Sequence, residues 1–304
     1  MEFSTYRALA QRIRLFGFSC VHYGDKRGHD ADKWRECLED IHQTDNAVVF
    51  GLGDYLDWTR TSYRLPIKAA FGDDDKALSQ LDDMVMDGLV YPFCDIVRKY
   101  CPSFAKKCPG LVEGNHHGTM LSSRFRNGRT TTEEICHLLG VPYLGLSAWV
   151  RITVYRCMGH KKMGAGHNLN VVLNHSVSGA GNLPSSLASA KRKIVDFRGV
   201  DVFLSGNDHQ LGHDLVPQLG CTQRGLPRIV QHQQVVGKVG SFQMGYRDGS
   251  TSNDYVEKKF LSPSRIGYLA FDAHVYYREL SPKDKATYGV QSSPEVWRFS
   301  NFSV

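Results

Sequence analysis

Four short polar clusters, each placed directly behind an apolar run, constrain the fold of this chain more than any other feature. The apolar runs have the length of buried strands, and loops at the carboxyl ends of strands meet at one edge of an α/β sheet. We therefore expect the polar side chains to converge in the folded chain. The clusters are Ser19-Cys20-Val21-His22, Gly53-Asp54-Tyr55-Leu56-Asp57, Gly114-Asn115-His116-His117 and Gly206-Asn207-Asp208-His209, and a fifth, Asn174-His175, follows another such run.

The segments between the clusters predict alternating strands and helices. Continuous apolar runs indicate buried strands, and apolar residues at three- and four-residue steps indicate helices. Strands are expected at 13–18, 47–52, 110–113, 149–155, 169–173 and 200–204, and helices at 31–42, 132–139 and 187–197. The strands at 149–155 and 169–173 should form a hairpin, whereas the tail from 229 onward predicts mostly short strand-like runs.

The length of the chain, 304 residues, fits one large domain, because α/β folds of this size often remain a single cooperative unit. We predict one domain over residues 1–304. Between 59 and 109 the apolar residues recur at helical spacing, which predicts a helical elaboration of that domain, kinked or broken at Pro92. The sequence leaves open whether this elaboration covers the site as a lid or forms a dimer contact.

The composition is that of an ordinary globular protein, with 41% hydrophobic and 22% charged residues, so the chain can bury a sizeable core. No run approaches the roughly 18 apolar residues of a membrane span, and the N-terminus lacks the apolar core of a signal peptide. The eight cysteines are scattered and form no CxxC pair. We therefore expect a soluble, cytoplasmic protein with reduced cysteines and no membrane partner.

The order and wording of the polar clusters resemble the calcineurin-like metallophosphoesterase family. The family pattern is Asp-x-His, then Gly-Asp-x-x-Asp, Gly-Asn-His-Asp/Glu, a lone His and Gly-His-x-His, and the matching segments run from about residue 16 to residue 209. The resemblance implies an α/β fold, a four-layer αββα sandwich in which two facing mixed β-sheets are flanked by helices. It also implies a hydrolase that cuts phosphate esters with two divalent metal ions.

The ligand set that this resemblance implies falls on seven residues. The first metal takes Cys20, His22 and His209, the second takes Asn115, His175 and Asn207, and Asp54 bridges the two. Such ligands suit manganese, iron or zinc, and two-metal sites hold their ions about 3.5 to 4 Å apart. The resemblance further implies a metal-bridging hydroxide as nucleophile. His116 is then the general acid for the leaving group, and Asp57 orients its ring.

Three positions depart from the family pattern. Cys20 stands where the family has aspartate, Asn207 where it has the first histidine of the last motif, and His117 where an acidic residue is usual. A thiolate is a softer ligand and favours zinc or iron, and an asparagine supplies only a neutral oxygen to the second metal. Asp208 and His213, from the same loop as His209, are reserve ligand candidates.

Neither the motifs nor the fold select the substrate, since related sites act on many phosphate esters. The net charge of +6 and local basic clusters favour a nucleic-acid or nucleotide phosphodiester, because positive potential attracts phosphates. Two alternatives stay open: a pseudoenzyme that serves as a binding or scaffolding module, and a nucleic-acid-binding protein acting through its basic residues. The clusters are Arg98-Lys99, Lys106-Lys107, 124–129, Lys161-Lys162 and Lys191-Arg192-Lys193.

Overall fold

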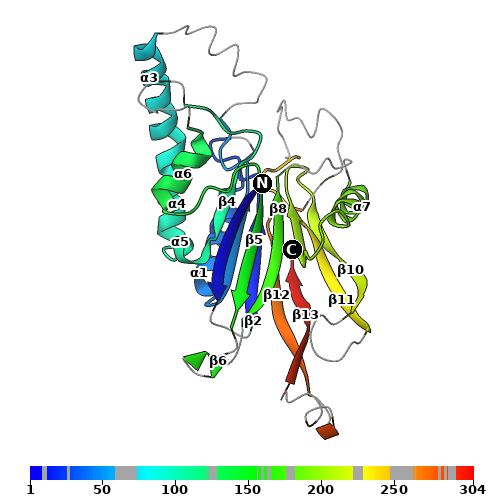
Figure 1. The fold of residues 1–304 in the computed structure, drawn as a ribbon. Coiled ribbons are helices and arrows are strands. Elements are labelled where there is room, and N and C mark those ends of the chain that lie inside the picture. The colour runs from blue at the N-terminus through cyan, green and yellow to red at the C-terminus, as the bar shows by residue number, and fades with distance from the viewer. Residues whose placement is uncertain are drawn as a thin grey trace.

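Two β-sheets face one another at the centre of the computed structural model (Figure 1). It describes residues 1–8, 12–25, 28–58, 74–120, 122, 129–155, 157–158, 161–162, 166–175, 182–221, 229–246, 263, 265–279, 282–283, 286 and 292–304. The six-stranded sheet runs, edge to edge, β1 (Glu2–Ala8), β5 (Ser147–Val154), β8 (His167–Asn174), β9 (Val202–Ser205), β11 (Ile229–Val239) and β10 (Leu211–Cys221). The five-stranded sheet runs β13 (Ser292–Ser303), β12 (Leu269–Glu279), β2 (Arg12–Phe18), β3 (Ala47–Leu52) and β4 (Gly110–Val112).

Both sheets are mixed, and their parallel parts carry the polar clusters. In the five-stranded sheet β2, β3 and β4 are parallel neighbours, and in the six-stranded sheet β8, β9 and β11 are. The carboxyl ends of parallel strands lie at the same edge of a sheet, so the clusters that follow them are gathered there. A separate two-stranded ribbon, β6 (Cys157–Met158) with β7 (Lys161–Lys162), lies outside both sheets.

Three clusters of buried apolar side chains fill the spaces between four layers. The middle cluster joins the two sheets, with Leu15 of β2 and Val171 of β8 among its fully buried members. Helices flank both outer faces (Figure 1), as predicted, so the four-layer αββα sandwich is confirmed. The helices on the five-stranded sheet are α1 (Ala31–Gln43), α3 (Asp75–Val85), α4 (Tyr91–Tyr100), α5 (Phe104–Lys107) and α6 (Thr131–Leu139), and α7 (Leu183–Ile194) covers the six-stranded sheet.

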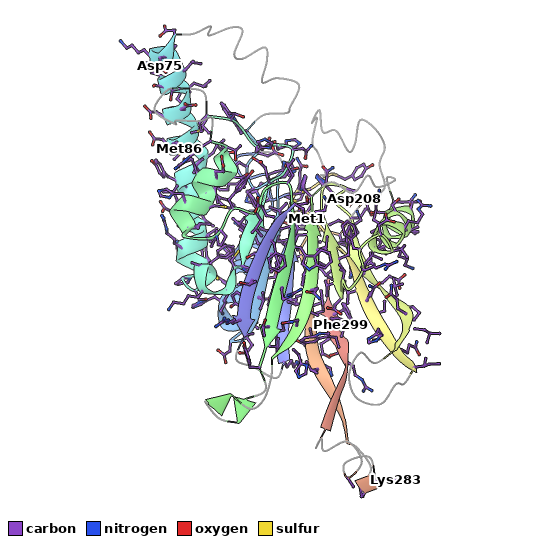
Figure 2. All side chains as sticks on the ribbon, in the orientation of Figure 1. Met1, Asp75, Met86, Asp208, Lys283 and Phe299 are labelled. Atoms are coloured by element: carbon purple, nitrogen blue, oxygen red, sulfur yellow. The ribbon has the colours of Figure 1, made fainter. Side chains whose placement is uncertain are left out.

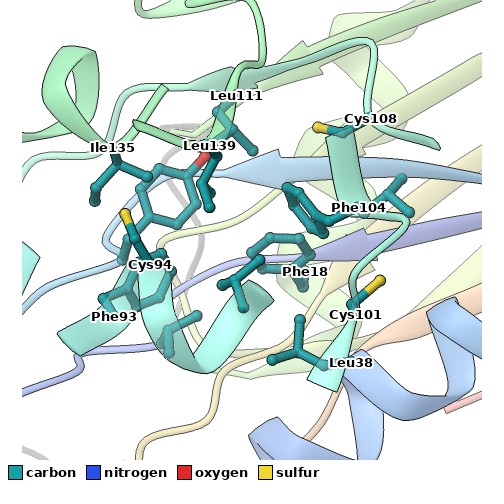
Figure 3. Close-up of a cluster of buried hydrophobic side chains, with 14 of the residues drawn as sticks. Phe18, Leu38, Phe93, Cys94, Cys101, Phe104, Cys108, Leu111, Ile135 and Leu139 are labelled. Carbon is teal, nitrogen blue, oxygen red and sulfur yellow. The ribbon is translucent and has the colours of Figure 1, made fainter. Parts of the chain in front are cut away.

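The helical side of the five-stranded sheet holds a core rich in aromatic rings and thiols (Figure 3). Phe18 of β2 packs against Trp34 of α1 with ring centroids 5.0 Å apart, and Trp34 stacks on Phe93 of α4 at 5.9 Å. On the helical side of the six-stranded sheet, Ala190 of α7 is buried against Val236 of β11. Burying such side chains stabilises the fold by about 1.5 to 3 kcal/mol each.

The central strands and helices predicted from the sequence are confirmed within a few residues. They include β2, β3, β4, α1 and α6, and the predicted hairpin of β5 with β8 is present as an antiparallel pair. The prediction for the tail was wrong, because β11, β12 and β13 are 11 or 12 residues long. Buried polar residues such as Asp272, which pairs with Arg14, interrupt the apolar pattern of these strands. The strands β1 and β10 were not predicted.

The helical elaboration is present between residues 74 and 107, and the part at 59–73 lies outside the described residues. A π-helical turn at Met86–Val90 joins α3 to α4, and Pro92 lies in the first turn of α4. Proline has no N–H to donate, so the first turn of a helix is where it costs least. The one-domain assignment stays a prediction. No helix of the described chain is long and apolar enough to cross a membrane.

Two glycines allow the ends of β3 and β4 to touch. Gly53 has φ +92°, and a Cβ built on it would lie 2.5 Å from the backbone of Gly114. A Cβ built on Gly114 would lie 2.1 Å from both the backbone nitrogen and the carboxylate of Asp54. These contacts are too close for any side chain, so glycine is required at both positions.

We expect Gly114→Ala to lower the free energy of unfolding by about 1 to 3 kcal/mol, because the new methyl group overpacks the Asp54 loop. Gly88→Ala is the matched control, since a Cβ at this helical position meets nothing within 4 Å. Urea unfolding followed by circular dichroism measures both. Equal stability of the two variants would contradict the close packing at Gly114.

Candidate metal centre

The side chains that follow five strand ends meet in one place. Three overlapping groups each bring their possible ligand atoms within 4.8 Å of one another. The groups overlap at Cys20 and His22, so they form one continuous centre between the two sheets. They are Cys20 with His22 and His209, Cys20 with Asp54 and His175, and His22 with Asp57 and His116.

The first group holds one sulfur and two imidazole rings. Cys20 is fully buried, His22 is 2% exposed, and the His22 and His209 rings have their centroids 5.4 Å apart. Both ring nitrogens of His22 are buried; Nδ1 lies 3.5 Å from Asp57 Oδ1, and Nε2 makes no hydrogen bond within the described part of the chain. Buried polar atoms are nearly always paired, so Nε2 has the character of an atom that binds a partner other than the protein.

The second group is built around Asp54 and His175, whose Oδ2 and Nε2 atoms are 3.0 Å apart. His175 Nδ1 donates to the carbonyl oxygen of Leu52, which in the neutral ring leaves the Nε2 lone pair facing the centre. The Asn115 side-chain amide lies 2.8 Å from His175 Nε2. With its nitrogen turned inward, that amide also donates to Asp54 Oδ2 at 2.7 Å and to Asn207 Oδ1 at 3.2 Å.

Five of the predicted ligands have a left-handed backbone. Their φ angles are +50° at Cys20, +49° at His22, +54° at Asp54, +69° at Asn207 and +57° at His209. In the described chain Asn301 is the sole other non-glycine residue with positive φ. Such a conformation costs roughly 1 to 3 kcal/mol at each residue and persists only where surrounding structure enforces it.

Hydrogen bonds between loops enforce this conformation. The backbone N–H of Cys20 donates to the Gly53 carbonyl at 3.0 Å, and that of His22 donates to the Asp54 carbonyl at 3.0 Å. The Cys20 carbonyl in turn accepts from the Ser241 hydroxyl at 3.1 Å and from the Phe242 N–H at 3.0 Å. The segment that follows β11 therefore fixes the first cluster, a role that was not predicted from the sequence.

His116 and Asp57 form a side-chain pair at the rim of the centre. His116 Nδ1 and His22 Nδ1 each lie 3.5 Å from Asp57 Oδ1, and the two imidazole rings have centroids 4.8 Å apart. These two neighbouring rings hold the pKa of Asp57 well below its usual value, so its carboxylate stays ionised. The backbone N–H of His116 also donates to Asp54 Oδ1 at 2.7 Å, which ties the acid candidate to the proposed bridging ligand.

The surroundings of Cys20 and His209 favour the protonated thiol and the neutral ring. Burial and then the negative charge of Asp54 raise the pKa of Cys20 well above its usual value. His209 is half-buried, and desolvation together with the His22 ring lowers its pKa to about 3. Burial raises the pKa of Asp54, but the His175 ring outweighs it and holds the pKa below its usual range.

This donor set fits a divalent transition metal. It combines a thiol, imidazole nitrogens, a carboxylate and the Asn207 amide oxygen, which suits zinc, iron or manganese better than magnesium. A cation would give His22 Nε2 the partner that it lacks among the described residues. It would also bind the Cys20 sulfur as a thiolate, since a coordinating thiol is deprotonated on binding.

The other candidates from the sequence lie apart from these groups. His117 Nδ1 contacts the Gly114 carbonyl at 2.6 Å, and its Nε2 lies 3.4 Å from Glu113 Oε1. His213 stacks on Phe302 with ring centroids 3.7 Å apart. Asp208 pairs with Lys238 of β11, a residue that no motif singled out.

Several residues of the basic clusters have partners within the described chain. Lys107 Nζ donates to the carbonyls of Ile41, His42 and Thr44 at the end of α1, each at 2.8 Å. Arg98 pairs with Asp95, and Lys191 pairs with Asp214. The side chains of residues 124–128, 161 and 162 lie outside the described residues.

Neither a protein-family model nor a curated protein sequence matches the chain. Among solved structures, Vps29 of Entamoeba histolytica complexed with zinc is 10% identical over 95% of this chain and 98% of its own, with a TM-score of 0.34. A metallophosphoesterase of Sphaerobacter thermophilus is 13% identical over 86% of this chain and 83% of its own, with a TM-score of 0.32. GAP50, the anchor in the inner membrane complex of Plasmodium, is 10% identical over 94% of this chain and 89% of its own, with a TM-score of 0.38. These TM-scores are too low to carry a functional argument, so the evidence for function is the geometry of this chain.

We expect cobalt(II) bound to the protein to show a sulfur-to-cobalt charge-transfer band in the near ultraviolet, because Cys20 would be a ligand. Cys20→Ala should abolish the band. Cys94→Ala is the matched control, since its thiol is also buried but belongs to none of the three groups. A band that persists in Cys20→Ala would exclude this thiol as a ligand.

Proposed function

We propose that the protein is a metal-dependent phosphoesterase that hydrolyses a phosphate ester at this centre. The observation that carries the proposal is the strained backbone of five converging residues, Cys20, His22, Asp54, Asn207 and His209. Strain of this kind is retained where function requires a geometry that relaxed loops do not give. Left-handed backbone at five predicted ligands is difficult to explain by packing alone.

The proposed ligand set is the one that the sequence resemblance implies, and its first part coincides with the group of Cys20, His22 and His209. Cys20, His22 and His209 would hold one cation, Asn115, His175 and Asn207 the other, and Asp54 would bridge them. When bound, the cations would neutralise charge on the phosphate and lower the pKa of a water molecule, so that it ionises to hydroxide. Manganese, iron and zinc all fit these donors, with the Cys20 sulfur favouring zinc or iron.

His116 is proposed to donate a proton to the leaving oxygen. Its side chain is 20% exposed, so substrate can reach it, whereas the His22 side chain on the other side of Asp57 is only 2% exposed. An ionised Asp57, whose Oδ1 lies 3.5 Å from His116 Nδ1, would orient the ring and leave Nε2–H directed toward the ester. The carboxylate therefore serves as a positioning group for the acid.

The substrate class stays a phosphate ester, with a nucleotide or nucleic-acid phosphodiester as a narrower prediction. Several of the basic residues that favoured nucleic acid, such as Lys107 at the end of α1, have partners within the described chain. The alternative of a pseudoenzyme rests on Asn207, whose amide oxygen is a weaker ligand than the imidazole it replaces. A single firmly held metal would fit that alternative.

The test is hydrolysis of bis-p-nitrophenyl phosphate and p-nitrophenyl phosphate with manganese, zinc or iron, together with metal analysis. His116→Ala should lower kcat by about 10²- to 10⁴-fold with metal content unchanged, because it removes only the proton donor. Asp54→Ala should lose both metal and turnover.

His42→Ala is the matched control. His42 is exposed in the last turn of α1, where it contacts Ser103, so its substitution should leave turnover unchanged. The preferred ester would separate a diesterase from a monoesterase. Bound metal without turnover of either ester would favour the pseudoenzyme. Salt-sensitive nucleic-acid binding that survives chelation and His116→Ala would instead favour a binding protein.

A further inference from the structure

A lysine is completely buried beside the loop that carries Asn207 and His209. Lys238 lies in β11, is 0% exposed, and places its Nζ 2.6 Å from Asp208 Oδ2. Asp208 is its one ion-pair partner among the described residues. A buried ammonium costs several kcal/mol unless it is paired, so an apolar side chain would be the simpler occupant of this space.

The topology places Lys238 directly beneath the loop. Its strand lies between β9 and β10, and Lys238 is opposite Ser205 at the end of β9 and opposite Gly212 near the start of β10. The loop that joins β9 to β10 is the one with the two proposed ligands. The Lys238 side chain therefore reaches the loop from the strand that holds both of its ends, and Figure 2 shows Asp208 beside the start of α7.

Asp208 has three polar partners, through one ion pair and two hydrogen bonds. Besides the ion pair with the Lys238 ammonium, its Oδ2 accepts the Ser186 hydroxyl of α7, and its Oδ1 accepts the Gln210 N–H at 3.3 Å. The residues on either side, Asn207 and His209, have φ +69° and +57° and face the metal-ligand groups. The chain thus alternates, with the anchored carboxylate pointing to one side and the two ligand side chains to the other.

We propose that the Lys238–Asp208 ion pair is a positioning device that sets the metal affinity of the centre by fixing the left-handed conformation of Asn207 and His209. The pair also keeps the Asp208 carboxylate turned away from the metal site. Without the pair, this carboxylate would compete with the neutral Asn207 side chain to bind the cation. Outer partners of this kind typically change metal affinity by about 10- to 100-fold. The proposal rests on the proposed metal centre but not on its catalytic activity.

Cobalt(II) titration of the full chain tests the proposal, with the Cys20 charge-transfer band as the signal and unfolding temperature measured in parallel. Lys238→Met should weaken cobalt binding by about 10- to 100-fold in protein that is folded at the assay temperature. Lys191→Met is the matched control, because it breaks the more exposed pair of Lys191 with Asp214 and should leave the affinity within about twofold.

The double variant Lys238→Met/Asp208→Asn separates positioning from stability, and it also serves if Lys238→Met alone fails to fold. Removing both charges leaves no unpaired buried ion, so the unfolding temperature should recover toward that of the wild type. Cobalt affinity should stay weakened, because the loop has lost its anchor.

Wild-type cobalt affinity and an unchanged band in Lys238→Met or in the double variant would overturn the positioning role. A wild-type chain that binds no cobalt would overturn the metal centre itself and this role with it. Intact cobalt binding without ester hydrolysis would count against the phosphoesterase alone. The two proposals therefore fail separately.

Discussion

The contact between the ends of β3 and β4 is the constraint on which the rest of the centre depends. Gly53 and Gly114 bring the two backbones so close that a Cβ on either would overlap its neighbour. This approach lets the His116 N–H donate to Asp54 and places Asn115 beside His175 from the other sheet. The sandwich is thereby joined at the edge where its parallel strands end, as well as through its apolar middle layer.

Strain at the centre is balanced by structure that is far away in the sequence. The left-handed Cys20 is held by Gly53 from one side and by Ser241 and Phe242 from the other. The left-handed Asn207 and His209 flank a carboxylate that is tied to β11 and α7. Several kcal/mol of backbone strain can persist in such a place because the loops are fixed by more than one bond each.

The possible ligand groups contain few carboxylates. Cys20 has a buried thiol where the pattern that the sequence resembles has an aspartate, so Asp54 is the one carboxylate in the two possible ligand groups that contain Cys20. Once deprotonated by a bound cation, this sulfur would carry the same single negative charge as a carboxylate, and it would be a softer donor. Asp208 supplies no second carboxylate, since Lys238 neutralises it away from the ligands.

The sequence by itself determined the central strands and the residues that converge, because apolar runs and the polar clusters behind them are local patterns. Asp54, His175 and His22 could be found in this way. The long strands of the tail could not, since buried polar residues such as Asp272 acquire their partners only after folding. Lys238 is a further case, because an isolated lysine in a sequence predicts a solvent-exposed side chain. Only the packing of β9, β10 and α7 around Lys238 buries its charge, beside the loop that carries the proposed ligands Asn207 and His209.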